Sequence, residues 1–152
     1  MRTQKENPMR ITLARFALPL AFFALVTAGA ARADTVTYEA TLKGADEVPP
    51  NDTTGTGKVE ASYDTKTMKL TYTVTFSGLS GPATAAHFHG PAKPGANAGP
   101  VITLSGKLDS PIKGEATLTA AQAKDLADGM WYLNVHTAAH TSGEIRGQIM
   151  KK

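Results

Sequence analysis

Residues 68–76 read MKLTYTVTF, and this stretch decides the fold class of the chain. Apolar and polar residues alternate strictly along it, which places five apolar side chains on one face of an extended strand: Met68, Leu70, Tyr72, Val74 and Phe76. Residues 58–63 alternate as well, and the polar turn 64–67 joins the two runs. Together they predict an antiparallel β-hairpin with one buried face.

Similar short runs continue on both sides of this hairpin. Stretches that fit strands, separated by turns rich in Gly, Pro and Asn, occupy residues 35–42, 85–89, 101–104, 114–118, 131–136 and 144–150. Thr119 and Gln122 form a Thr-x-x-Gln capping box, which predicts one short helix near residues 120–128 that Gly129 ends. The chain is therefore predicted to be all-β: an antiparallel β-sandwich or flattened Greek-key barrel of seven to eight strands with one short helix.

Residues 1–33 differ from the rest in composition. They hold five of the 16 Lys and Arg residues but one of the 13 Asp and Glu residues, and the uncharged run 16–30 ends in Ala31-Arg32-Ala33. This pattern is typical of a cleavable secretory signal peptide, because the apolar run is short for a membrane span. An uncleaved anchor is the alternative. Met9 is a second candidate start beside Met1, because the segment that it begins is already a complete signal.

Cleavage before Asp34 would leave a mature domain over residues 34–152, in a periplasmic or secreted location and with no membrane span. The remaining 11 basic and 12 acidic residues give this domain a net charge of −1. Such a charge offers no electrostatic footprint for nucleic acid or anionic lipid. The absence of Cys excludes disulfide scaffolds, thiolate zinc sites, iron–sulfur proteins and cysteine nucleophiles.

The four His residues of the chain are the candidate functional residues. His87 and His89 are two apart on a predicted strand and so share a face, His136 ends a later strand, and His140 lies in the loop that follows. Imidazole suits copper, zinc, nickel and iron, and export without any thiolate makes copper the first choice and zinc the second. The sequence predicts a metal site of His87, His89 and His136, with His140 as a fourth candidate. The alternative is that these His residues are exposed and bind no common metal ion.

Two charged residues near the C-terminus form a second pattern. Glu144 and Arg146 are two apart in the last predicted strand and so share a face. They predict a structural ion pair or charges that protect an edge strand from aggregation.

Three segments have a familiar order and spacing: residues 87–91 (HFHGP), 132–137 (YLNVHT) and 143–149 (GEIRGQI). As a set they resemble the CHRD domain, a family named from chordin and widespread in exported bacterial proteins, and the resemblance extends over residues 36–150. It implies an all-β domain. A looser similarity is to the copper-zinc superoxide dismutases, β-barrels with a His-x-His on one strand and a later Val-His. By that analogy His87, His89 and His136 would be copper ligands, but further zinc ligands and the disulfide are lacking.

Three functions remain open at this point. The leading hypothesis is an exported CHRD-domain protein that binds a transition metal, with buffering or delivery preferred over catalysis as its role. The second is a metal-free module that docks a periplasmic or surface protein, or a glycan. The third is a copper-only dismutase-like enzyme in which Arg146 attracts the anion. Metal content after purification from the periplasm discriminates between the first two.

Overall fold

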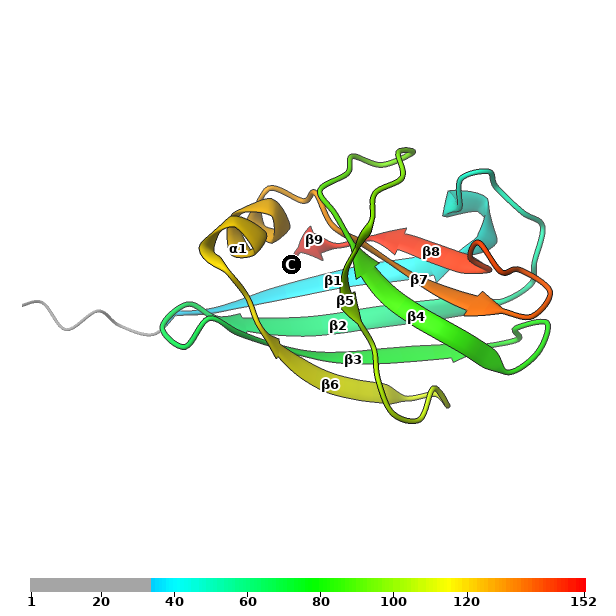
Figure 1. The fold of residues 1–152 in the computed structure, drawn as a ribbon, viewed down its shortest axis with the longest axis horizontal. Helices are drawn as coiled ribbons and strands as arrows, with labels where there is room; N and C mark the ends of the chain where they lie inside the picture. Colours follow the sequence, from blue (N-terminus) through cyan, green and yellow to red (C-terminus); the bar gives the residue numbers. More distant parts are fainter. Residues whose placement is uncertain (1–33) are drawn as a thin grey trace, which may run out of the picture. The chain divides into compact units, whose positions relative to one another are not determined.

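The computed structural model describes residues 34–152, so the predicted signal peptide, residues 1–33, lies outside the described residues. The strands are β1 (Thr35–Lys43), β2 (Thr56–Asp64), β3 (Lys69–Ser77), β4 (Ala83–His89), β5 (Pro100–Thr103), β6 (Ile112–Thr117), β7 (Tyr132–Thr137), β8 (Ile145–Gln148) and β9 (Met150–Lys151). Eight of them follow one another in a nearly closed, barrel-like antiparallel sheet, in the order β5-β4-β7-β8-β1-β2-β3-β6, and β9 pairs with β1 (Figure 1). The predicted all-β class is confirmed.

The predicted hairpin is formed by β2 and β3. Tyr63 pairs with Leu70 in its register, and the side chain of Asp64 accepts hydrogen bonds from the backbone N–H groups of Lys66 and Thr67 in the turn. Met68 has a left-handed backbone (φ 60°) where the chain turns into β3. Local turn chemistry therefore sets the register of this hairpin.

The helical prediction is also confirmed. The helix α1 covers Ala120–Ala127, and both halves of the capping box are present: Gln122 N donates to Thr119 Oγ1, and Thr119 N donates to Gln122 Oε1. Gly129 follows with a φ of +68°, which other residues rarely adopt, and so ends the helix. One further helical turn, the 3-10 helix η1 (Gly44–Asp46), follows β1.

The core fills the inside of the barrel. Phe88 of β4 lies edge-on to Tyr72 of β3, with 5.2 Å between ring centres, and packs against Trp131 on its other side. Leu70 and Leu133 are fully buried beside them. Burying one such side chain stabilises the fold by about 1.5–3 kcal/mol. Because Phe88 points inward, its neighbours His87 and His89 point outward from the barrel.

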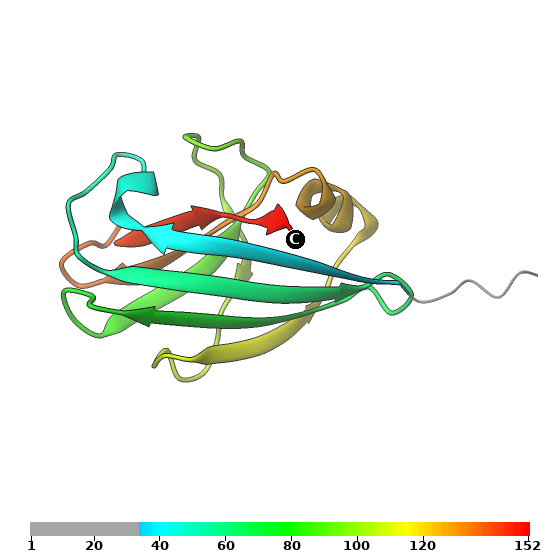
Figure 2. The same cartoon turned by 180° about the vertical axis from the view of Figure 1, so that it is seen from behind.

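One face of the structure differs from a simple inside–outside alternation. Tyr132 and Asn134 point out of the barrel on β7, yet both are buried. The long β4–β5 loop and the β1–β2 loop project from the same side of the barrel and are joined there, because Asn97 donates to the Val48 carbonyl (Figure 1). Figure 2 shows the opposite face, where β1, β2 and β3 carry no loop over them. The covered face is where the His residues lie.

Two expectations about the C-terminal strand need correction. The predicted strand 144–150 is divided, since Ile149 leaves the ladder and its N–H bonds to the Trp131 carbonyl. Glu144 and Arg146 form no ion pair with each other, because each has other partners. No helix within residues 34–152 is long and apolar enough to cross a membrane.

Candidate metal centre

Two adjacent strands carry the three clustered His residues. His87 and His89 lie on β4, and His136 lies on β7. In the β4–β7 register His87 is opposite Asn134 and His136 is opposite Ala85, so His87 and His136 are diagonal neighbours on the same outward face. The register of β4 against β7 therefore brings His136 next to His87 and His89, and the spacing of these residues in the sequence does not.

The ring nitrogens of these three residues converge. His87 Nδ1 lies 3.1 Å from His136 Nε2, and one ring nitrogen from each of His87, His89 and His136 lies within 4.8 Å of the others. Two nitrogens bonded to one ion at about 2.0–2.1 Å are roughly 2.9–3.4 Å apart at ordinary coordination angles. The spacing of His87 and His136 therefore suits two ligands of one ion.

Backbone carbonyls hold the other nitrogens of two of the rings. His136 Nδ1 donates to the Thr141 carbonyl (3.0 Å), and His89 Nδ1 donates to the Ala98 carbonyl (2.9 Å). Since a carbonyl can only accept, Nδ1 carries the proton in both rings, and in the neutral form Nε2 carries the lone pair. In the metal-free protein this lone pair faces His87 Nδ1 in the case of His136, and Asn134 in the case of His89. Metal-binding His residues are commonly oriented by such partners.

The side chain of Asn134 also contacts His89. Its Oδ1 lies 3.0 Å from His89 Nε2, and both residues are buried. A half-turn of the amide would place its NH₂ there instead, so Asn134 can accompany either a protonated or an unprotonated Nε2. A metal ligand must be unprotonated, and coordination by His89 Nε2 therefore requires that it leave Asn134.

Burial favours the neutral rings that metal binding needs. Desolvation lowers the pKa of His87 below 6.5, and the positive charges of His136 and His89 act in the same direction. Desolvation also lowers the pKa of His89, and this outweighs the hydrogen bonds to Ala98 and Asn134. Both rings thus stay neutral to lower pH than an exposed His.

His140 is not part of this cluster. It lies in the turn between β7 and β8, where its backbone N–H donates to the Thr137 carbonyl and its carbonyl accepts from the Thr137 N–H. Within residues 34–152, the cluster of His87, His89 and His136 is the only group of three His or acidic residues close enough to share an ion.

Two residues next to His89, Tyr132 and Asn134, were given no role by the sequence analysis, and Arg146 was given a different one. The Tyr132 ring stacks on His89 in parallel (4.7 Å, 1°), and the Arg146 guanidinium lies 3.4 Å above the centre of the Tyr132 ring. Tyr132 and Asn134 alternate with the apolar residues Leu133 and Val135 along β7, a pattern that can be read in the sequence. What the sequence lacks is the register that places them opposite His87 and His89.

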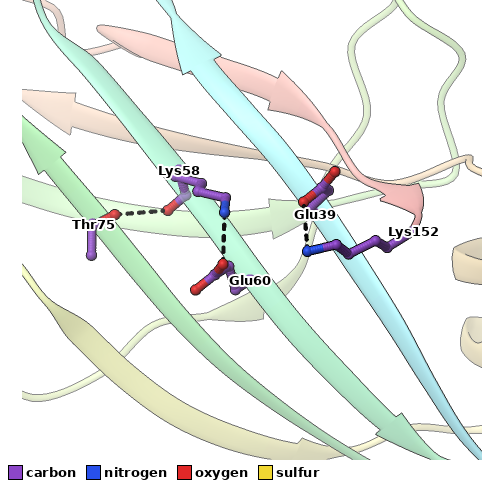
Figure 3. A network of polar contacts seen from close by, with 5 residues as sticks. All are labelled: Glu39, Lys58, Glu60, Thr75 and Lys152. Atoms are coloured by element: carbon purple, nitrogen blue, oxygen red, sulfur yellow. Dashed lines mark hydrogen bonds and ion pairs between the residues drawn. The ribbon is translucent and has the colours of Figure 1, made fainter.

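A broad hollow on the opposite face of the barrel offers no comparable site. It has a volume of about 490 Å³, and no His lines it. Its surroundings carry charges of both signs that pair with each other: Lys58 with Glu60 (2.6 Å) and Lys152 with Glu39 (3.6 Å) (Figure 3). These pairs are exposed to solvent and each joins opposite charges, so they leave no buried charge that an ion would have to balance.

Comparison with known proteins agrees with the resemblance in the sequence. A family model of the CHRD domain matches residues 38–149, which include all three clustered His residues and Arg146. No curated protein and no solved structure matches the chain. Since the matched residues make up most of the sequence, the chain belongs to the CHRD domain family.

Proposed function

We propose that this CHRD-domain protein binds a transition metal ion, copper in the first place, through His87, His89 and His136. Its role would be metal buffering or delivery outside the cytoplasm, where the predicted signal peptide directs it. The observation that carries the proposal is the convergence of three ring nitrogens within 4.8 Å. The carbonyl partners of His89 and His136 support it, because they fix the tautomer in which Nε2 of each ring carries the lone pair that a metal ion needs.

Copper is preferred on the chemistry of the donors. An all-imidazole set suits Cu(II) and Zn(II), and among divalent first-row metals Cu(II) binds most tightly to a given nitrogen site. Zinc is the second choice because it accepts three His ligands as readily.

The exposure of the cluster favours buffering or delivery. His89 is buried, whereas His87 and His136 are half-buried, so one side of the cluster is open to solvent. An ion held there could be passed to a partner without unfolding of the barrel. This open side distinguishes the cluster from a closed structural metal site.

Calorimetric titration of the metal-free protein tests the proposal. We expect one Cu(II) per chain, and His87→Ala or His136→Ala to weaken binding at least about 100-fold, since removal of a residue that only orients a ligand already costs 10–100-fold. His140→Ala is the matched control and should change the affinity less than about threefold. Circular dichroism of each variant verifies the fold. Equal, weak binding by the wild type and all variants would refute the proposal and favour the metal-free interaction module.

A further inference from the structure

We infer that Arg146 is a positioning residue for His89, which it holds through the Tyr132 ring and through the β4–β5 loop. The inference deepens the proposed function, on which its consequence for metal binding rests. The positioning itself is a property of the metal-free protein and can be tested there.

The first connection is a stack of three side chains. Arg146 and Tyr132 are buried, and the guanidinium lies 3.4 Å from the Tyr132 ring centre. His89 is the third member of the stack, and its ring is parallel to that of Tyr132. A cation over an aromatic face is attracted to it, more strongly when both are desolvated. Tyr132 thereby presents a fixed surface against which the His89 ring lies flat.

The second connection runs through the β4–β5 loop. Arg146 Nη1 donates to Asn97 Oδ1 (2.8 Å), and Nη2 donates to the Ala96 carbonyl. Two residues after Ala96, the Ala98 carbonyl accepts the hydrogen bond that His89 Nδ1 donates. The Tyr132 hydroxyl also hydrogen-bonds to Ala98, at 3.2 Å. The same guanidinium therefore fixes the ring beneath His89 and the carbonyl that selects its tautomer.

The partners of Arg146 fit this role better than a role in an ion pair. Within residues 34–152, no carboxylate lies within salt-bridge distance of Arg146, although the residue is only 2% exposed. Burying a cation without a paired carboxylate is costly, so its neighbours must offer compensation. A flat guanidinium stacks on Tyr132 and donates sideways to the loop at once, which an ammonium cannot do. Arg146→Lys should therefore keep the charge and lose the positioning.

Nuclear magnetic resonance of the metal-free protein provides the first test. In a long-range ¹H–¹⁵N spectrum of the wild type, we expect a protonated His89 Nδ1 whose proton exchanges slowly with water. In Arg146→Lys that proton should exchange fast or disappear. Gln148→Ala is the control, because Gln148 holds the same loop at Ala92 instead of at residues 96–98, and should leave the signal unchanged. An unchanged His89 signal in Arg146→Lys would overturn the inference, as would its equal loss in Gln148→Ala.

A double-mutant cycle with Cu(II) provides the second test. Arg146→Lys should weaken Cu(II) binding about 10–100-fold in the wild-type background, and have no effect on the residual binding of His89→Ala. An equal loss in both backgrounds would show that Arg146 acts on the whole fold, and would contradict the inference.

Two further measurements distinguish a failure of the positioning role from a failure to fold or to bind metal. If Arg146→Lys does not fold, Tyr132→Leu removes the stacked ring together with its hydroxyl contact to Ala98 and should give the same loss of the His89 Nδ1 proton. Tyr132→Phe keeps the stack, loses only the hydroxyl, and should retain the proton. A wild type that binds no Cu(II) would refute the proposed function, and the magnetic resonance arm would still decide the positioning role.

Discussion

Glu144 and Glu47 are both buried carboxyl groups, and the structure treats them in opposite ways. Glu144 accepts four hydrogen bonds: from Ser80 N, Ser80 Oγ, Thr137 Oγ1 and Thr53 Oγ1, all at 2.6–2.7 Å. Burial alone would raise the pKa of this carboxyl, but the hydrogen bonds from Ser80, Thr137 and Thr53 outweigh it and lower the pKa from 4.5 to about 2.

Glu47 has no such set of donors. Burial raises its pKa from 4.5 to about 7, although the charge of Arg146 and the amide of Asn134 oppose the shift, and Oε1 has no hydrogen-bond partner. It lies beside Asn134, since a Cβ at Gly143 would collide with both side chains. Asn134 in turn contacts His89. Every oxygen of the Glu144 carboxylate thus has donors, whereas beside Asn134 and the His cluster one buried carboxylate oxygen, Glu47 Oε1, has no hydrogen-bond partner.

The largest expected effect is the loss of the Glu144 network. Glu144→Gln should lower the free energy of unfolding at pH 7 by about 2–4 kcal/mol, because the hydroxyl and N–H donors lose their charged acceptor. A depressed pKa contributes stability that is present above pH 4.5 and is lost as the pH falls toward 2. Urea unfolding at pH 7 and pH 2.5 measures it. The difference between variant and wild type should shrink at the lower pH, and a constant difference would contradict the assignment.

Glu47→Gln should change the free energy of unfolding in the opposite direction. At pH 8 the wild type keeps an ionised carboxyl in a buried site, and Gln, which is neutral, should raise the free energy of unfolding by about 1–3 kcal/mol. A raised pKa contributes stability that is present below pH 4.5 and is lost as the pH rises through about 7. The gain should therefore vanish near pH 4.5. Thermal unfolding of the wild type and of Glu47→Gln between pH 4.5 and pH 8 measures this difference in stability. A variant less stable than the wild type at pH 8 would contradict the contrast between Glu47 and Glu144.

The pH dependence of Cu(II) binding should be shifted. Three ordinary imidazoles, each half-protonated near pH 6.5, lower an affinity about eightfold there. His87 and His89 have lowered pKa values, so we expect a smaller loss at pH 6.5 and a decline at lower pH. A peptide of residues 85–91 carries the same two His residues without the fold and is the control. Identical pH midpoints for protein and peptide would show that burial does not act on the rings.

The smallest effect should be on the metal-free fold. His136→Ala should change the free energy of unfolding by less than about 1 kcal/mol, because a half-buried ring at the end of β7 contributes little packing and only partly buried hydrogen bonds, to Thr141 and His87. Denaturant unfolding in the presence of a chelator measures it. A loss as large as that of Glu144→Gln would make the His cluster a structural network too.

The strands, the helix and one half of the cluster could be predicted from local pattern. Alternation in residues 68–76 places Tyr72 and Val74 in the core, and the His-x-His spacing places two rings on one face, because both depend on neighbours in the chain. The stack of Arg146 on Tyr132 depends on register across three strands and on a loop that covers them, neither of which spacing encodes. The predicted pairing of Glu144 with Arg146 was wrong for the same reason, because residues on other strands and loops became their partners. Export and the identity of the metal stay predictions.

Pulsed electron paramagnetic resonance of the Cu(II)-loaded protein tests the central claim most directly, because it counts the imidazoles that coordinate the ion. The wild type should show one Cu(II) with three coordinated imidazoles, His136→Ala should show two, and His140→Ala should match the wild type. A Cu(II) signal without coordinated imidazole, or one that is the same after His87→Ala and His136→Ala, would contradict a metal centre of His87, His89 and His136.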